Sequence, residues 1–196
     1  KCAIHTEFSS NSNWYYDWEE YCFKPENREV LKTAVDEWIA DPDTARIQYG
    51  HINIWDTSLI TNMSDLFHDT AFNDDISGWD VSGVTEMFSM FRLAESFNQD
   101  IGDWDVANVT HMSWMFNRAS SFNDDISDWD VSSVTDMGSM FDEATSFNGD
   151  ISDWDVSNVT DMSWMFALAT SFNGDISDWN VSSVTNMGGM FYGAES

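Results

Sequence analysis

The sequence predicts an α/β repeat fold, a right-handed solenoid whose rungs each contribute one short parallel strand and one short helix. Tryptophan recurs at one constant interval along most of the chain, at Trp79, Trp104, Trp129, Trp154 and Trp179. A fixed period of this length indicates supersecondary units that stack and bury a continuous core. The composition agrees, because 42% of the 196 residues are hydrophobic, which is enough for such a core in water.

The residues around each tryptophan predict the strand of the rung. Ile76, Trp79 and Val81 have the Leu-x-x-Leu-x-Leu spacing that forms the strand of a leucine-rich repeat. Because successive side chains of a strand point to opposite faces, Trp79 and Val81 should face the core. Asp80 should then point to solvent.

The second half of the rung predicts one or two helical turns. Its apolar residues are spaced three and four apart, at Val84, Met87, Met90, Phe91 and Ala94. Thr85 stands where a helix N-cap would accept the first free amides. The turn that follows contains Asn98, and we expect this asparagine and its equivalents to form a ladder that satisfies loop backbone.

The chain divides into residues 1–54, an N-terminal aromatic arm with a capping helix, and residues 55–196, a solenoid of about six rungs. Apolar residues from Leu31 to Ile39 follow the helical period, and Asp41-Pro42 should end that helix. The first rung is one residue short, between Phe67 and Phe72. The last rung is truncated at Ser196, so we expect the chain to continue or to form a dimer through this uncapped end.

The two cysteines, Cys2 and Cys22, both lie in the N-terminal arm. They form either a disulfide that holds the arm or two free thiols, since no neighbouring ligand pattern suggests a metal site. We expect the disulfide, which would indicate an oxidising compartment.

The charge is strongly acidic, with 35 Asp and Glu against 7 Lys and Arg, a formal net charge of −28. Phosphate recognition depends on clustered Lys and Arg, so nucleic-acid binding is not expected. Docking on anionic membranes is disfavoured for the same reason. No apolar run approaches the roughly 20 residues that span a bilayer, so no membrane span is expected in this chain.

The repeat resembles a known family of surface proteins. Its core, Val-Thr-x-Met-x-x-Met-Phe-x-x-Ala-x-x-Phe, is similar to that of the BspA-type leucine-rich-repeat surface proteins. The form Trp-Asp-Val-Ser-Asn-Val-Thr-Asp-Met at residues 154–162 resembles the 25-residue subgroup found in mycoplasma-type surface lipoproteins and in marine microbes and algae. The resemblance implies a secreted or cell-surface solenoid that acts in adhesion or recognition, and it supplies no catalytic residues.

Two acidic columns on the predicted strand face are the candidate metal or partner site. The first follows the repeated tryptophan, at Asp80, Asp105, Asp130 and Asp155, and the second precedes it, at Asp103, Asp128, Asp153 and Asp178. Carboxylates on adjacent rungs, about 4.8 Å apart, repel one another. Bound cations, ambient salt, hydrogen bonds from Ser or backbone amides, or protonation must offset this repulsion. Ca²⁺ would suit an all-oxygen site of irregular geometry.

Trp114 and Trp164 are candidate partner-binding residues, because they share one rung position that holds Ser89, Ser139 and Gly189 in the rungs around them. They lie either exposed on the convex surface, where they would stack on a sugar or a partner, or buried between alternate rungs where the small residues leave space.

These features predict a binding or adhesion module rather than an enzyme. The four histidines are scattered, no hydrolase or metalloprotease motif is present, and a repeated column gives each carboxylate nearly the same environment. We expect an extracellular module that presents an acidic face to a cationic partner or to divalent cations such as calcium, with a protein or glycan of a cell surface or matrix as partner. The alternative is a structural surface or cell-wall spacer without a specific ligand.

Overall fold

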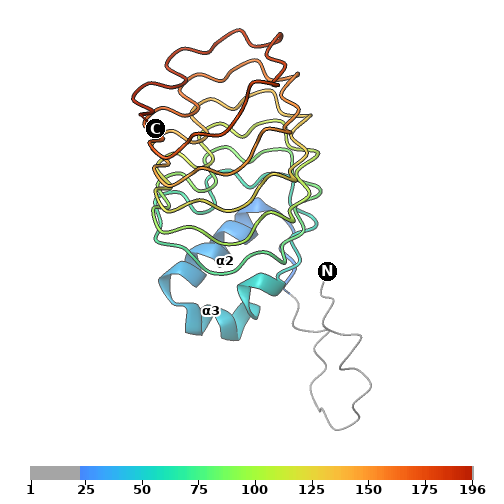
Figure 1. Ribbon diagram of the computed structural model, residues 1–196. Helices are drawn as coiled ribbons and strands as arrows, with labels where there is room; N and C mark the ends of the chain where they lie inside the picture. The colour runs from blue at the N-terminus through green and yellow to red at the C-terminus, as the bar shows by residue number, and fades with distance from the viewer. Residues whose placement is uncertain (1–22, 196) are drawn as a thin grey trace.

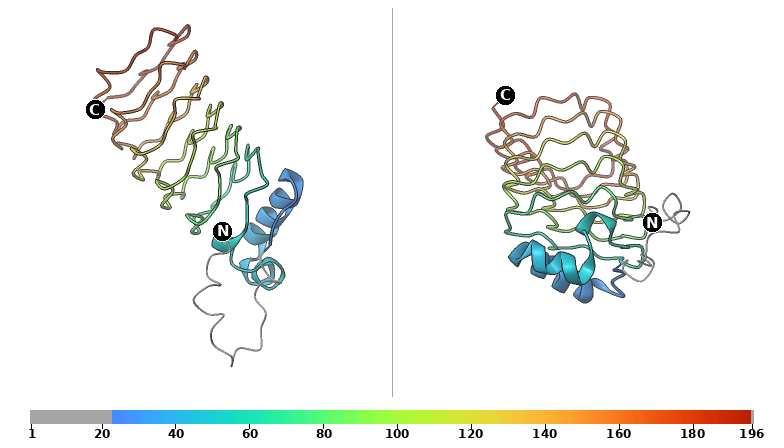
Figure 2. Two further views of the ribbon diagram at one scale, coloured as in Figure 1. Left: turned by 90° about the vertical axis from the view of Figure 1, so that its right-hand side faces the viewer. Right: turned by 90° about the horizontal axis from the view of Figure 1, so that it is seen from below.

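The computed structural model, which describes residues 23–195, is a stack of coils closed at one end by helices (Figure 1). The helices are α2 (Arg28–Ala40), α3 (Pro42–Tyr49) and the short 3₁₀ helix η2 (Ile52–Ile54). The coils lie as successive layers, and the last coil lies at the end of the stack opposite to α2 and α3 (Figure 2). Cys2 and Cys22 lie outside the described residues, as does the predicted disulfide.

Helix α2 begins at a polar cap and buries one stripe. The Asn27 side chain accepts a hydrogen bond from the Val30 amide at 3.1 Å, which satisfies one of the free donors of the first turn. The stripe Leu31, Ala34, Val35 and Trp38 is buried, as the helical period predicts. Asp41 then ends α2 and caps α3 through the Thr44 amide, so the predicted helix is confirmed, and α3 is an element that the pattern did not predict.

The helices cover the apolar end of the first coil. Trp38 of α2 packs edge-on against Trp55, with ring centroids 5.9 Å apart. Its indole nitrogen donates to Asp74 at 2.7 Å. Phe23 packs on the same Trp55 ring at 5.1 Å. The end of the core is therefore closed by aromatic side chains, and Trp55 is only 1% exposed.

The predicted strand-plus-helix rung is wrong. Residues 55–195 contain no α-helix and no strand, and each coil consists of turns joined by extended segments. The coils meet as a β-ladder only at isolated parallel bridges, which link Asn62, Glu86, His111, Asp136, Asp161 and Asn186 in succession. The fold is therefore not a leucine-rich-repeat solenoid of strands and helices.

The helical half of the rung fails because its backbone amides bond to the next coil. Met87 donates to the His111 carbonyl at 3.0 Å, and Phe91 donates to that of Met115 at 2.9 Å. A helix would direct these amides four residues back along its own chain. Ser89 and Leu93 also have positive φ angles of 54° and 61°, which a right-handed helix excludes.

The strand half of the rung fails because two tight turns occupy it. Trp79 donates to the carbonyl of Ile76 at 3.1 Å, and Val84 donates to that of Val81 at 2.8 Å. Few residues between these turns remain extended, too few for a ladder with the neighbouring coil. The alternating orientation nevertheless holds, since Trp79 and Val81 are buried and Asp80 is partly exposed.

The hydrogen bonds locate the short first rung. The Phe67 amide donates to the carbonyl of Met90, 23 residues further along the chain. The equivalent Phe91 amide donates to the carbonyl of Met115, 24 residues further along, so the first coil is one residue shorter. The later coils contain a turn closed by the Phe97 amide and the Ala94 carbonyl. In the first coil the Phe72 amide instead donates to the Thr70 hydroxyl. The predicted deletion between Phe67 and Phe72 is therefore confirmed.

The repeated aromatic side chains fill the core. The periodic tryptophans are at most 8% exposed. Each indole N–H donates to an isoleucine carbonyl, that of Ile52 in η2 for Trp79 and one in the coil before for the others, as Trp129 does to Ile101 at 3.0 Å. The phenylalanines stack coil on coil, with successive ring centroids 5.3–5.7 Å apart from Phe67 to Phe166. Aromatic pairs at such separations contribute beyond the area they bury.

Two polar ladders run beside this core. Each asparagine oxygen of the first ladder accepts the amide of the next asparagine at 2.8 Å, through Asn73, Asn98, Asn123, Asn148 and Asn173. The predicted asparagine ladder is confirmed. The threonines cap no helix; instead each hydroxyl donates to the threonine carbonyl of the coil before, as Thr160 does to Thr135 at 3.0 Å.

Replacing Asn123 by Ala should destabilise the stack, because the Asn148 amide loses its acceptor. A typical hydrogen bond contributes about 1 kcal/mol, which corresponds to a fall in Tm of roughly 2–4 °C for a chain of this size. Asn123→Asp keeps an acceptor oxygen and serves as the control in thermal unfolding. Equal losses in both variants would contradict the ladder's contribution.

Candidate binding surfaces

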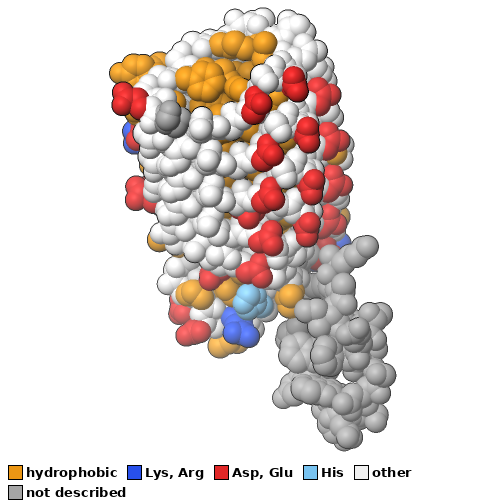
Figure 3. Space-filling view, viewed as in Figure 1, with side chains coloured by type: hydrophobic (Ala, Val, Ile, Leu, Met, Phe, Trp, Pro, Cys, Tyr) orange, Lys and Arg blue, Asp and Glu red, His pale blue; other side chains and the backbone are white. Residues whose placement is uncertain are grey.

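The two predicted acidic columns lie on the surface of the stack, and together we call them the acidic face. Acidic side chains run in rows along one side of the molecule (Figure 3). Seven of the eight aspartates are exposed and one, Asp80, is partly exposed. The structure thus brings both columns together as surface rows, at the positions Asp80, Asp105, Asp130, Asp155, Asp103, Asp128, Asp153 and Asp178.

The first column is held by short-range turns. Asp80 accepts from the Ser82 amide at 3.1 Å and from the Ser82 hydroxyl at 2.6 Å. The same amide bond recurs at 3.1–3.2 Å in Asp105, Asp130 and Asp155. This Asx turn explains why an aspartate or asparagine follows each periodic tryptophan. Hydrogen bonding, one of the predicted ways to offset the repulsion, is therefore present in the structure.

These turns keep the carboxylates charged. The hydrogen bonds from the Ser82, Ser132 and Ser157 hydroxyls and amides hold the pKa of Asp80, Asp130 and Asp155 below the ordinary range. These three carboxylates are therefore ionised at neutral pH.

The second column has no such partner. Within residues 23–195, none of Asp103, Asp128, Asp153 and Asp178 makes a hydrogen bond or an ion pair through its side chain. The first coil has Gly78 at this position, where a Cβ atom would lie 2.4 Å from the Asn53 carbonyl oxygen. A side chain at this position would therefore clash where η2 lies against the first coil. In the later coils the aspartate side chains of this column stabilise the described part of the chain through no hydrogen bond or ion pair.

Neither column converges on a metal site. In the part of the chain that the structure describes, no three His, Cys, Asp or Glu side chains come together to hold an ion. Ca²⁺ requires six to eight oxygen ligands, and single carboxylates spread along a row do not provide them.

Asp155→Asn should keep the Asx turn while removing a charge, because Asn180 makes the same turn at 3.2 Å in the next coil. Thermal unfolding at low ionic strength should therefore show unchanged or higher stability for Asp155→Asn and lower stability for Asp155→Ala. Salt should reduce the benefit of the Asn variant. A loss of stability in Asp155→Asn equal to that of Asp155→Ala would show that the charge, not the turn, is needed.

Trp114 and Trp164 occupy equivalent positions but different environments. Trp164 is 46% exposed, whereas Trp114 is only partly exposed and lies under Arg92, whose Cζ is 4.7 Å from the ring centroid. Both have positive φ angles, 63° for Trp114 and 58° for Trp164. The structure therefore shows an open indole at Trp164 and a covered one at Trp114.

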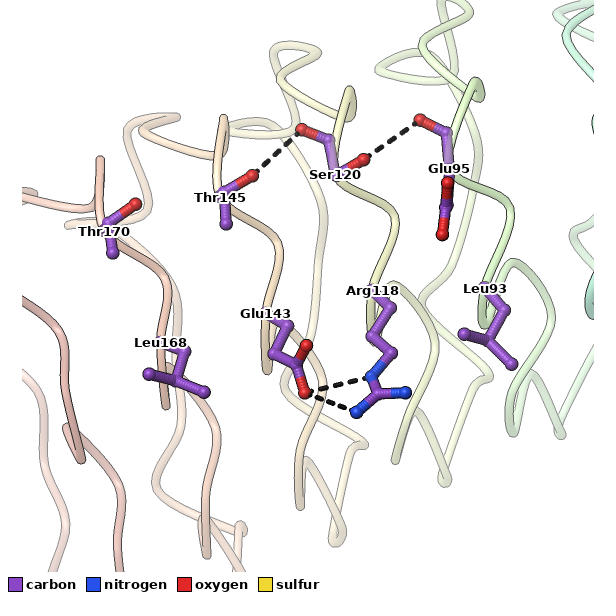
Figure 4. Close-up of a pocket in the computed structure, with 8 residues that line it drawn as sticks. All are labelled: Leu93, Glu95, Arg118, Ser120, Glu143, Thr145, Leu168 and Thr170. Atoms are coloured by element: carbon purple, nitrogen blue, oxygen red, sulfur yellow. Dashed lines mark hydrogen bonds and ion pairs between the residues drawn. The ribbon is translucent and has the colours of Figure 1, made fainter.

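A shallow groove of about 480 Å³ crosses four coils. Its lining includes Arg118 and Leu168, which follow Trp114 and Trp164 closely in the sequence. One row of its lining has a charged pair between two leucines, and the other row has Glu95 followed by three hydroxyl side chains (Figure 4). Arg118 donates through Nε and Nη2 to Oε1 of Glu143, at 2.9 and 2.7 Å. Leu93 and Leu168 lie at either end of this pair (Figure 4).

Asp142 is the most perturbed carboxyl near this pair. Burial and the neighbouring Glu143 raise the pKa of Asp142 to about 6. The Asn117 amide donates to its Oδ2 at 3.0 Å. These residues were not predicted, although the sequence contains the signal: the position of Asp142 changes in every rung, through Arg92, Asn117, Asp142, Ala167 and Tyr192.

Asp142→Asn should flatten part of the pH dependence of stability. A carboxyl whose pKa is raised in the folded state stabilises the fold below its unfolded pKa, and this contribution is lost as pH rises through about 6. The Tm advantage of Asp142→Asn over wild type should therefore grow between pH 4 and 7. For Asp155→Asn, which removes a carboxyl of lowered pKa, the difference from wild type should stay nearly constant over this range and change only below about pH 4. A constant difference for Asp142→Asn would refute the raised pKa.

Comparisons with known proteins link the chain to one family. The family model described as "Mycoplasma protein of unknown function, DUF285" matches residues 39–138 and 123–196. No match was found among curated proteins or among solved structures. Between residues 23 and 195, none of the helices has the length and apolarity needed to cross a membrane.

Proposed function

We propose that this chain, which belongs to the DUF285 family of mycoplasma proteins of unknown function, is a binding module that presents its acidic face to a cationic protein at a cell surface or matrix. The resemblance of its repeat to BspA-type surface proteins supports the extracellular setting. A secreted or cell-surface location is part of this proposal.

The observation that carries the proposal is the uncompensated charge of the acidic face. Residues 55–196 contain only two Lys or Arg residues, Arg92 and Arg118, and Arg118 is paired with Glu143. Asp56 begins the first column and is paired with Lys24 at 2.8 Å; the four aspartates after it have no ion pair among the described residues. A surface with rows of one sign of charge attracts and orients a partner of the opposite sign.

The second column argues for a ligand more strongly than the first. The first column has a structural reason, since its aspartates close Asx turns. Asp103, Asp128, Asp153 and Asp178 close no turn, yet an acid recurs at this position in four successive coils. Repeated repulsion without a folding role favours a function in binding. Because the carboxylates do not converge, we propose a cationic protein surface rather than calcium as the ligand.

A lysine-rich peptide tests the acidic face. Asp103→Asn, Asp128→Asn, Asp153→Asn and Asp178→Asn in one variant should slow association at low ionic strength by roughly tenfold or more, and salt should remove the difference. Stopped-flow or surface-plasmon measurements give the rates. The control variant carries the same change in net charge elsewhere, at Glu26→Gln, Asp65→Asn, Asp69→Asn and Glu195→Gln.

The two variants separate a binding face from net charge alone. Equal slowing in both would contradict a defined acidic face. Unchanged association in the second-column variant would favour the alternative function, a surface spacer without a specific ligand. Dimerisation through the C-terminal end stays a prediction that size measurements in solution can test.

A further inference from the structure

The covered tryptophan shows how this surface holds a guanidinium group. Arg92 lies over the Trp114 ring at 4.7 Å, within the range of a cation–π interaction. Among residues 23–195 Arg92 makes no ion pair, and its Nε is buried without a hydrogen-bond partner. The indole is therefore the one interaction that the structure shows for this cation.

The equivalent place beside Trp164 holds a carboxylate instead. Asp142 precedes Trp164 by the same interval in the sequence by which Arg92 precedes Trp114. Because the coils repeat, Asp142 has the position relative to Trp164 that Arg92 has relative to Trp114. The chain thus supplies the cation at the first tryptophan and an anion at the second.

The Trp164 ring is supported on one side and accessible on the other. A Cβ atom on Gly189 would lie 2.8, 2.9 and 3.1 Å from Cδ2, Cε2 and Cε3 of Trp164. These atoms surround the bond shared by the two rings, so Gly189 faces the plane of the indole rather than its edge. The 46% exposure of Trp164 then belongs largely to the opposite plane and the rim.

Tyr192 contacts Trp164 from the same coil as Gly189. Its ring centroid is 5.6 Å from that of Trp164, with the planes inclined by 57°, and Tyr192 is 62% exposed. The free plane of Trp164 therefore faces the coil of Asp142, and an open indole with a nearby carboxylate is a combination that binds cationic side chains in proteins.

We propose that Trp164 and Asp142 form a subsite for an arginine side chain of a partner protein, which takes the place that Arg92 takes at Trp114. The guanidinium group stacks on the free plane of Trp164 and donates to the Asp142 carboxylate, whose Oδ2 already accepts from Asn117. This subsite adds a defined contact to the proposed function, and none of its residues belongs to the acidic face.

The chemistry favours a cation over a neutral sugar. A saccharide would also use the indole plane and donate hydroxyl hydrogen bonds to the carboxylate, but only a guanidinium adds an ion pair with parallel N–H donors. The net charge of −28 also concentrates cations at the surface. A planar guanidinium can stack and pair at once, which an ammonium group cannot.

Titration of the full chain with Nα-acetyl-L-argininamide, followed through the indole N–H signals of ¹⁵N-tryptophan-labelled protein, tests the subsite. The chain has 11 tryptophans, so Trp114→Phe and Trp164→Phe assign the two signals by their loss. The Trp164 signal should shift in a saturable manner at neutral pH, and the Trp114 signal should not. Asp142→Asn should weaken the affinity by roughly tenfold.

Two exchanges provide matched controls. Asp142→Arg should place an internal guanidinium on Trp164 and abolish the shift, and Arg92→Asp should make the Trp114 signal respond to the probe. No saturable shift of Trp164, or equal shifts with Nα-acetyl-L-glutaminamide or glucose, would overturn the proposal. The test of this subsite is independent of the acidic face, because Asp103, Asp128, Asp153 and Asp178 stay intact in all these variants.

Discussion

The stack depends on the backbone amides that each coil donates forward to the next. Met112, Trp114, Phe116 and Arg118 of one coil donate to carbonyls of the following coil, at 2.8–3.0 Å. The positive φ angles of Trp114 and Arg118 belong to this arrangement. Such angles are strained for side chains other than Gly, so the forward hydrogen bonds and the packing beneath them must hold these residues in place.

The same backbone explains why two kinds of surface coexist on one repeat. Where Asx turns close the chain, the carboxylate is part of the fold and recurs in each coil, as at Asp80 and Asp130. Between two forward-donating amides, such as those of Phe141 and Glu143, the backbone imposes no particular side chain. Residues as different as Arg92, Asp142 and Tyr192 therefore share one position, and binding can differ from coil to coil while the stack remains unchanged.

Sequence patterns predicted the period, the core and the end of the stack. The spacing of Trp79 and its equivalents, the helix that buries Leu31 and the ladder through Asn98 all follow from local rules of burial and hydrogen bonding. The secondary structure within a rung did not follow, because Val84, Met87, Met90, Phe91 and Ala94 have the spacing of a helical face and also that of successive tight turns. Periodicity alone does not distinguish these when the amide partners lie in another coil.

The candidate surfaces divide in a similar way. The acidic columns could be located from the repeat, because equivalent positions of a stack form rows. The repeat pattern could not show whether Trp114 or Trp164 is open to solvent, since this depends on Arg92 reaching across one coil and on Gly189 leaving room for a flat indole. Both are contacts between coils, which spacing within a rung does not describe.

Forward donation from coil to coil is the central claim, and scalar couplings through hydrogen bonds test it most directly. In a deuterated, ¹⁵N,¹³C-labelled sample, the Phe116 amide nitrogen should couple to the carbonyl carbon of Met140, to which it donates at 2.9 Å. A coupling from Phe116 to the Met112 carbonyl carbon, the bond of an α-helix, would contradict this account of the fold and of the surfaces that depend on it.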